Sequence, residues 1–193
     1  MTGTSALRSI NCTQCGAPLT LRGGHRVESI TCGFCGSVLD THEDFKVLKT
    51  YADIKRPYLP FGLGQQGTIK DVEFTIIGTV QYQDDWGERW LDMALFSPTH
   101  GYAWLEYANG HFLFSRRIRD LPESPIVNRA KSKFDACGHE FTVFSRYNAR
   151  VTFVEGELTY VAEIGDKVAL LDAIAPPYMY TVERNETEEE DLL

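Results

Sequence analysis

Four of the five cysteines form two Cys-x-x-Cys pairs near the start of the chain. Cys12 and Cys15 are the first pair, Cys32 and Cys35 are the second, and sixteen residues lie between the pairs. Two cysteines three positions apart can turn tightly enough to direct both sulfurs at one ion, and a second such turn completes a tetrahedron. We therefore predict that these four cysteines bind a zinc ion. Because four thiolates leave no open coordination position, the zinc should be structural.

A glycine follows the second cysteine of each pair, at Gly16 and Gly36. We predict a positive φ at both glycines, which lets backbone amides approach the sulfurs. Three other interpretations of the cysteines are two disulfides, a redox pair and an iron–sulfur cluster. A reducing cytosol disfavours the disulfides, a redox site needs only one pair, and iron–sulfur clusters more often use other spacings.

The segment between the cysteine pairs is typical of a zinc ribbon spanning about residues 9–41. Residues 18–22 and 27–31 are short runs that predict strands on either side of Gly23 and Gly24. About 30 residues bury little core, so the metal should supply most of the folding free energy of this module.

We predict that the chain divides into four regions. They are a zinc ribbon (1–41), a linker (42–58), a β-rich domain (59–185) and an acidic tail (186–193). The linker is either a short helix, since Phe45, Leu48 and Ala52 lie three or four positions apart, or an extended connection.

Short runs of β-branched and aromatic residues separated by turn residues fill the region after residue 61. This pattern predicts a mainly β fold, in which the ribbon precedes an antiparallel β-sandwich or barrel-like domain. Asn109-Gly110 between two such runs is a strong hairpin signal. The predicted strands are 67–71, 72–82, 89–96, 102–107, 111–114, 140–147, 149–155, 167–172 and 178–183.

The net charge is −8, which disfavours nucleic acid as a partner. No apolar run is long enough for a membrane span, and the first residues lack a signal-peptide pattern, so we expect a cytoplasmic protein. Residues 115–135 are locally basic, which suggests a solvated loop or an anion site. Their cations are Arg116, Arg117, Arg119, Arg129, Lys131 and Lys133. The acidic tail could be a solvated end or a docking peptide for a basic partner.

Two pairs of residues are candidates for catalysis. Glu155 and Glu157 would lie on one side of a regular strand and could share a proton or bind a cation, although the glycine between them is typical of a bulge or a turn. Cys137 and His139 could be a nucleophile and its base, an extra metal ligand pair, or an ordinary thiol near a turn.

Two further patterns have structural as well as functional interpretations. The segment 62–67 matches Gly-x-Gly-x-x-Gly, but no helix is predicted after it, so a phosphate cradle is not expected. An aromatic-rich stretch is either core or a stacking face for a partner. Its members are Trp86, Trp90, Tyr102, Trp104, Tyr107 and Phe112.

Residues 59–64 (LPFGLG), 72–82 (VEFTIIGTVQY), 102–105 (YAWL), 151–157 (VTFVEGE) and 172–177 (DAIAPP) carry a family resemblance. Over about residues 59–185 the chain resembles a bacterial family known as domain of unknown function 4178, in which a leading zinc ribbon is frequent. The resemblance implies a fold lineage and no established reaction. It also implies an accessory role near the inner face of the membrane, beside membrane-stress proteins.

We therefore expect a non-enzymatic zinc-binding adaptor that makes protein–protein contacts, in a membrane-stress-associated or peripheral membrane-associated complex. One alternative is a nucleic-acid-binding zinc-ribbon protein. Another is an uncharacterised enzyme that uses Glu155 with Glu157, or Cys137 with His139.

Overall fold

The structure is a computed structural model that describes residues 8–51, 55–118 and 132–185. Within these residues the chain forms fourteen β-strands and no helix. Neighbouring strands pair in antiparallel ladders, and the four paired cysteines lie among the first strands. The prediction of a mainly β chain with an N-terminal cysteine cluster is confirmed.

The chain divides into two compact units, which we describe separately. Unit 1 comprises Met1–Tyr82, Arg89–Arg116 and Val151–Gly165, and unit 2 comprises Gln83–Glu88, Arg117–Arg150 and Asp166–Leu193. Unit 1 therefore combines the cysteine-bearing segment with strands from the middle of the chain. The acidic tail 186–193 lies outside the described residues.

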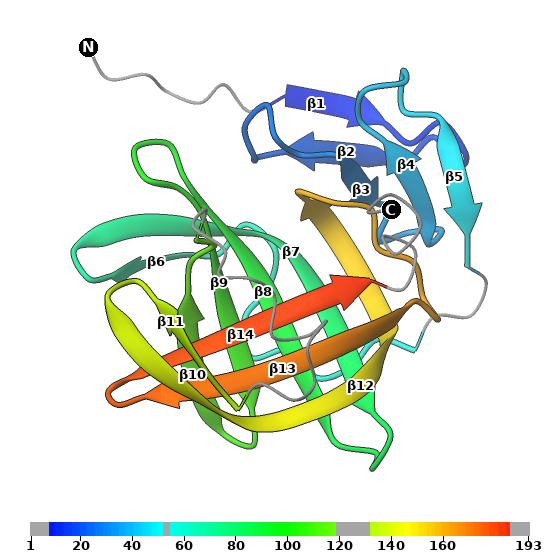
Figure 1. The fold of residues 1–193 in the computed structure, drawn as a ribbon. Helices are drawn as coiled ribbons and strands as arrows, with labels where there is room; N and C mark the ends of the chain where they lie inside the picture. The colour runs from blue at the N-terminus through cyan, green and yellow to red at the C-terminus, as the bar shows by residue number, and fades with distance from the viewer. Residues whose placement is uncertain (1–7, 52–54, 119–131, 186–193) are drawn as a thin grey trace. The chain divides into compact units, whose positions relative to one another are not determined.

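Unit 1 contains most of the strands (Figure 1). They are β1 (Arg8–Asn11), β2 (Pro18–Leu21), β3 (Ser29–Thr31), β4 (Ser37–Asp40), β5 (Val47–Thr50), β6 (Gln66–Ile69), β8 (Arg89–Ser97), β9 (Gly101–Ala108), β10 (His111–Ser115), most of β7 (Val72–Asp84) and the end of β12 (His139–Leu158).

Most strands of unit 1 belong to one sheet, in the order β10-β9-β8-β7-β12-β3-β4-β5. Strand β6 pairs with β7, and β1 and β2 form a separate two-stranded sheet. The end of β12 lies between β7 and β3, with Gly156 opposite both Gly78 and Thr31. The cysteine-bearing hairpin β3–β4 therefore extends the same sheet as the strands of the middle of the chain.

Two buried clusters contribute to the core of unit 1. Alternate residues of β7, β8 and β9 face one side of the sheet, and the period-2 pattern of their apolar residues explains this burial. The first cluster contains Phe74, Ile76, Met93, Leu95 and Ala103. The second, around the cysteines, contains Cys12, Leu19, Ile30, Cys32 and Leu39.

The predicted Asn109-Gly110 hairpin is present between β9 and β10. Ala108 lies opposite His111, and the two turn residues have φ values of 50° and 84°. A two-residue loop with positive φ at both central positions matches the twist of the strands that it joins, and asparagine and glycine tolerate that conformation best. The sequence signal and the local geometry therefore agree here.

Unit 2 is a smaller antiparallel sheet. Strand β11 (Lys133–Ala136) and strand β13 (Lys167–Ala175) pair with the first part of β12, and β14 (Tyr178–Asn185) pairs with β13. Aromatic and aliphatic side chains from all four strands pack on one face. The buried members are Phe134, Ala136, Phe141, Leu171, Ala173 and Tyr180.

Of the two alternatives predicted for the linker, the short helix is wrong. Residues 47–50 form the edge strand β5, which pairs with β4, while Ala52 lies outside the described residues. Ladder hydrogen bonds to β4 are available to this segment, and three apolar residues at helical spacing do not outweigh them. The predicted strands 140–147 and 149–155 also form one continuous strand, β12.

Asp172 in unit 2 gives a test of how burial acts on a carboxyl group. Its Oδ1 accepts a hydrogen bond of 2.8 Å from the Thr181 hydroxyl, and Tyr147 also hydrogen-bonds to it. Burial raises the pKa of Asp172, and these two hydrogen bonds only partly offset that effect.

We expect Asp172→Asn to remove a pH dependence of stability. Because the folded pKa lies above the unfolded one, the wild-type carboxyl favours folding most at a pH below its unfolded pKa of about 3.9, and this contribution is lost as the pH rises through the folded pKa. Urea unfolding of both proteins between pH 4 and 7 measures it. The free energy of unfolding of the wild type should fall relative to that of Asp172→Asn as the pH rises. If the free energy of unfolding of the wild type minus that of Asp172→Asn stays constant or rises with pH, the pKa of Asp172 is not raised by folding.

Candidate metal centre

Two loops of the same geometry carry the four cysteines. In the β1–β2 loop the amide of Gly16 donates to the Cys12 carbonyl at 2.8 Å, and in the β3–β4 loop the amide of Gly36 donates to the Cys32 carbonyl at 2.9 Å. The φ values of Gly16 and Gly36 are 75° and 70°. The predicted positive φ at both glycines is confirmed. Both Cys-x-x-Cys-Gly segments therefore fold into tight turns that place their two sulfurs on one side. We call these turns the first and the second knuckle.

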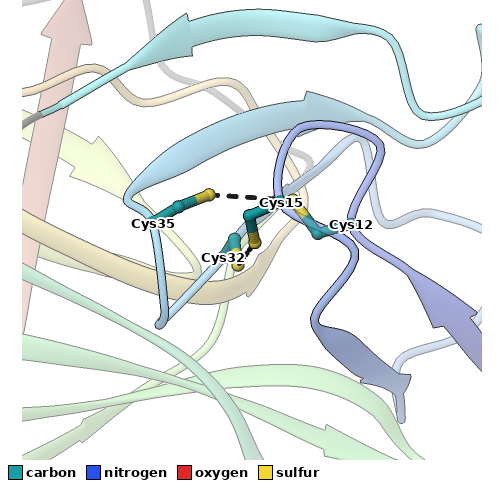
Figure 2. A group of neighbouring side chains, drawn as sticks. All are labelled: Cys12, Cys15, Cys32 and Cys35. Atoms are coloured by element: carbon teal, nitrogen blue, oxygen red, sulfur yellow. Dashed lines mark hydrogen bonds between the residues drawn. The ribbon is translucent and has the colours of Figure 1, made fainter.

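The two knuckles bring the four sulfurs together (Figure 2). All four Sγ atoms lie within 4.8 Å of one another, and the Cys12–Cys35 and Cys15–Cys32 sulfur pairs are each 3.8 Å apart. A tetrahedral ion with metal–sulfur bonds of about 2.3 Å places its ligands about 3.8 Å apart. A disulfide needs about 2.05 Å, so these are free thiols, and the two separations of 3.8 Å match edges of a tetrahedron with a sulfur at each corner.

The surroundings act differently on the two thiols of the second knuckle. Burial raises the pKa of Cys32 to about 12, while the amides of Cys35 and Phe34 act to lower it. At Cys35, burial again acts to raise the pKa, but hydrogen bonds with the hydroxyl and amide of Ser37, and with the thiols of Cys15 and Cys32, lower the pKa to about 7. The Ser37 hydroxyl is also hydrogen-bonded to the Thr50 hydroxyl at 2.8 Å, which connects β4 with β5.

The four cysteines could together hold one metal ion. The donor set consists only of sulfur, which suits a soft or borderline metal such as zinc, and the neighbouring amides and the Ser37 hydroxyl can support the negative charge of thiolates. A bound metal ion would keep the thiols deprotonated and hold the two knuckles together. The four protein ligands fill a tetrahedral shell, so the arrangement suits a structural role.

The end of β12 is connected to the cysteine-bearing segment by specific hydrogen bonds. The buried Glu157 carboxylate accepts from the amides of Arg22 and Gly23, at 2.7 and 2.8 Å, in the turn between β2 and β3. The amide of Glu28 donates to the Leu158 carbonyl at 2.9 Å. The position of the second knuckle therefore depends on β12 as well as on the sulfurs.

Glu157→Gln tests this connection. Glutamine keeps one acceptor oxygen but turns an NH₂ group toward the other amide donor, so one buried N–H loses its partner. We expect a loss of about 1–3 kcal/mol in the free energy of unfolding, measured by urea denaturation. Glu43→Gln is the matched control, because its exposed ion pair with Lys46 should contribute less than about 1 kcal/mol. Equal losses in the two variants would contradict the role assigned to Glu157.

Each carboxylate of the predicted pair Glu155 and Glu157 has a partner of its own. Glu155 forms an ion pair with Arg56, whose Nη2 lies 2.7 Å from Oε2 and donates a hydrogen bond of 2.9 Å to Oε1, whereas Glu157 accepts hydrogen bonds from the β2–β3 turn. Gly156 has a φ of 73°, which interrupts the regular strand between them. Burial raises the pKa of both carboxyls, and their hydrogen bonds act in the opposite direction.

The predicted pair Cys137 and His139 lies at the β11–β12 turn. Cys137 is exposed and has a φ of 51°, as a first central residue of a two-residue hairpin loop. The His139 ring packs against the Tyr178 ring at 4.8 Å between centroids. The geometry matches the interpretation of Cys137 as a thiol in a turn.

The aromatic-rich stretch is split between core and surface. Trp90 stacks on the buried Tyr82, and Trp104 packs against Tyr160, whereas Trp86 is 74% exposed.

Of the basic segment, Arg119, Arg129 and Lys131 lie outside the described residues, while Lys133 pairs with Glu140 at 2.7 Å. The Gly-x-Gly-x-x-Gly segment leads into strand β6, so the expectation that no helix follows it is confirmed.

The sequence gives no indication of a cavity beside the second knuckle. This cavity has a volume of about 330 Å³, and its lining includes Phe34, Tyr51, Phe153 and the Arg56–Glu155 ion pair. Phe34 lies between the candidate ligands Cys32 and Cys35 in the chain, so its place in the turn could have been noted from the sequence. Arg56 and Glu155 are 99 residues apart, so only the fold brings them to this place.

Among the described residues, no helix has the length and apolar character needed to cross a bilayer. The fold and the sulfur cluster define a mainly β protein with a candidate four-cysteine metal centre in its first unit. The chain belongs to the family described as Domain of unknown function (DUF4178), which matches residues 62–192. The resemblance noted in the sequence is thereby confirmed, and the cysteines precede the matched region. No curated protein and no solved structure matches the chain.

Proposed function

We propose that this chain is a zinc-stabilised, non-enzymatic adaptor of the cytoplasm that makes protein–protein contacts through its second knuckle. Four sulfurs within 4.8 Å of one another, two pairs of them at the 3.8 Å expected for a tetrahedral site, support zinc as the ion. The zinc would fix the knuckle, and the knuckle would present a recognition surface.

The observation that carries the proposal is the exposure of Phe34. Its side chain is 74% exposed, although it lies between the two ligands Cys32 and Cys35, where the backbone is tightly constrained. The turn needs glycine at Gly36 and sulfur at both ends, but it has no need of a phenyl ring at position 34. Aromatic side chains, phenylalanine included, are enriched in the buried parts of protein interfaces.

The cavity beside Phe34 gives this anchor a neighbouring depression. Tyr51 and Phe153 supply apolar walls, and the Arg56 side chain is 58% exposed while its partner Glu155 is buried. A partner side chain could enter this depression while Phe34 packs on the partner surface. Such combinations of a protruding anchor and an adjacent pocket are typical of specific interfaces.

Affinity purification from the native cell, with metal analysis of the same sample, tests the proposal. We expect the wild type to carry one zinc ion and to recover one complex repeatedly. Phe34→Ser should keep the zinc and lose at least about nine-tenths of the recovery. Phe144→Ser, which alters a 58% exposed phenylalanine on β12, is the matched control and should recover the complex normally. Equal recovery of the complex by both variants would refute the second knuckle as the contact surface. Iron in place of zinc in the purified protein would refute the proposal that the bound ion is zinc.

A further inference from the structure

The turn between β7 and β8, residues 84–88, is a second place where a rigid segment presents an aromatic ring. The Asp84 carboxylate accepts hydrogen bonds from the amides of Trp86 and Glu88, each at 2.9 Å. The amide of Gly87 donates to the Asp84 carbonyl at 3.2 Å, and that of Asp84 donates to the Glu88 carbonyl at 3.0 Å. Four hydrogen bonds therefore hold a five-residue turn in one conformation.

Folding of this turn does not require a tryptophan. Asp84 supplies the acceptor that closes the turn, and Gly87 adopts a φ of 92°, which favours glycine. Position 86 contributes only its backbone amide to these bonds, and the Trp86 side chain is 74% exposed. Burial in the fold therefore does not explain the indole, whose large apolar surface stays in water.

The charges around Trp86 indicate the kind of surface that it fits. Asp85 and Glu88 flank the indole and are exposed, and no ion pair with another described residue neutralises them. Arg89 is the single cation at the start of β8. Acidic neighbours would be repelled by an anionic membrane surface but would complement lysine or arginine side chains around a protein pocket.

We propose that the 84–88 turn is an anchor whose Trp86 inserts into an apolar pocket of a partner protein with a basic rim. The indole supplies the buried contact area, and Asp85 and Glu88 supply electrostatic attraction to the rim. The hydrogen-bonded turn is ordered before binding, so little conformational entropy is lost on association. This inference rests on the proposed adaptor function only in requiring a protein partner, since it concerns a different surface.

Photo-crosslinking in the native cell identifies the partner. p-Benzoylphenylalanine is placed at position 86 in one variant and, as the control, at position 58, where Tyr58 is 79% exposed, in another. We expect one protein adduct at position 86 that is absent at position 58. An adduct with a second copy of the chain, or no adduct specific to position 86, overturns the proposal.

Binding of the identified protein, purified and measured by calorimetry, then decides the role of the indole. Trp86→Ala should weaken the affinity at least about 30-fold, as expected for a dominant interface residue, without changing the circular dichroism spectrum. Replacing both Asp85 and Glu88 with lysine should slow association and reduce its dependence on salt concentration. Equal affinity of the wild type and Trp86→Ala overturns the proposal.

A vesicle-binding experiment and a comparison of two variants separate the Trp86 anchor from lipid binding and from contact through the second knuckle. Sedimentation with phosphatidylcholine or phosphatidylglycerol vesicles that depends on Trp86 would show that the turn binds lipid, and would overturn the protein pocket. If Phe34→Ser loses the complex and Trp86→Ala keeps it, the anchor is wrong and the adaptor proposal stands. If Trp86→Ala loses the complex and Phe34→Ser keeps it, the anchor stands and the knuckle is not the contact surface.

Discussion

Cys32→Ser should abolish zinc binding at the proposed centre and unfold the hairpin that carries the second knuckle. Cys32 is buried and is one of four sulfurs that all lie within 4.8 Å of one another. Apparent binding free energies of structural zinc in small modules are about 10–16 kcal/mol, so removal of one ligand should cost more than about 4 kcal/mol locally. Elemental analysis should find no stoichiometric zinc in this variant.

The same variant should also change the end of β12. Gly156, Glu157 and Leu158 lie opposite the residues of β3, so loss of that strand removes their ladder partners. Hydrogen exchange should therefore accelerate in β3, in β4 and over residues 156–158. Cys137→Ser, which alters the exposed fifth cysteine, is the control and should leave both the zinc content and the exchange rates unchanged. Normal protection of β3 in a metal-free Cys32→Ser protein would show that the centre does not stabilise this strand.

Gly156→Ala should be among the most destabilising single substitutions outside the metal centre. The residue has a φ of 73°, and a Cβ atom there would overlap the carbonyl oxygen of Ile77 in the neighbouring strand. A left-handed backbone costs an alanine about 1–2 kcal/mol, and the steric overlap must be relieved by separating β7 from β12. We expect a loss of more than about 3 kcal/mol in the free energy of unfolding, measured in urea.

Gly101→Ala is the control that separates the two costs. Gly101 also has a φ of 73°, but a Cβ atom there would meet nothing within 4 Å. This variant should lose only the backbone cost of about 1–2 kcal/mol. Equal losses at both positions would contradict the close approach of the two strands at Gly156.

Local patterns in the sequence predicted much of the secondary structure correctly. The period-2 runs of β7, β8 and β9 and the Asn109-Gly110 turn depend on residues that are neighbours in the chain. The linker was predicted less well, because the edge strand β5 owes its conformation to pairing with β4 and has little preference of its own.

The carboxylates of β12 show why site prediction from the sequence has a limit. A regular strand would place Glu155 and Glu157 together, but the positive φ of Gly156 separates their environments. Arg56 then pairs with Glu155 across 99 residues, and the β2–β3 turn takes Glu157. Neither partner could be found from spacing, because both contacts require the sheet to be formed first.

The sequence by itself determined the four candidate sulfur ligands, since each Cys-x-x-Cys-Gly turn is a local structure that its own residues specify. It also determined the mainly β character and the membership of the family. Only the tertiary structure decided that β3 and β4 extend the sheet through β12, and that Phe34 and Trp86 remain exposed on rigid turns. Burial and strand neighbours depend on contacts between distant parts of the chain, and local spacing carries no information about such contacts.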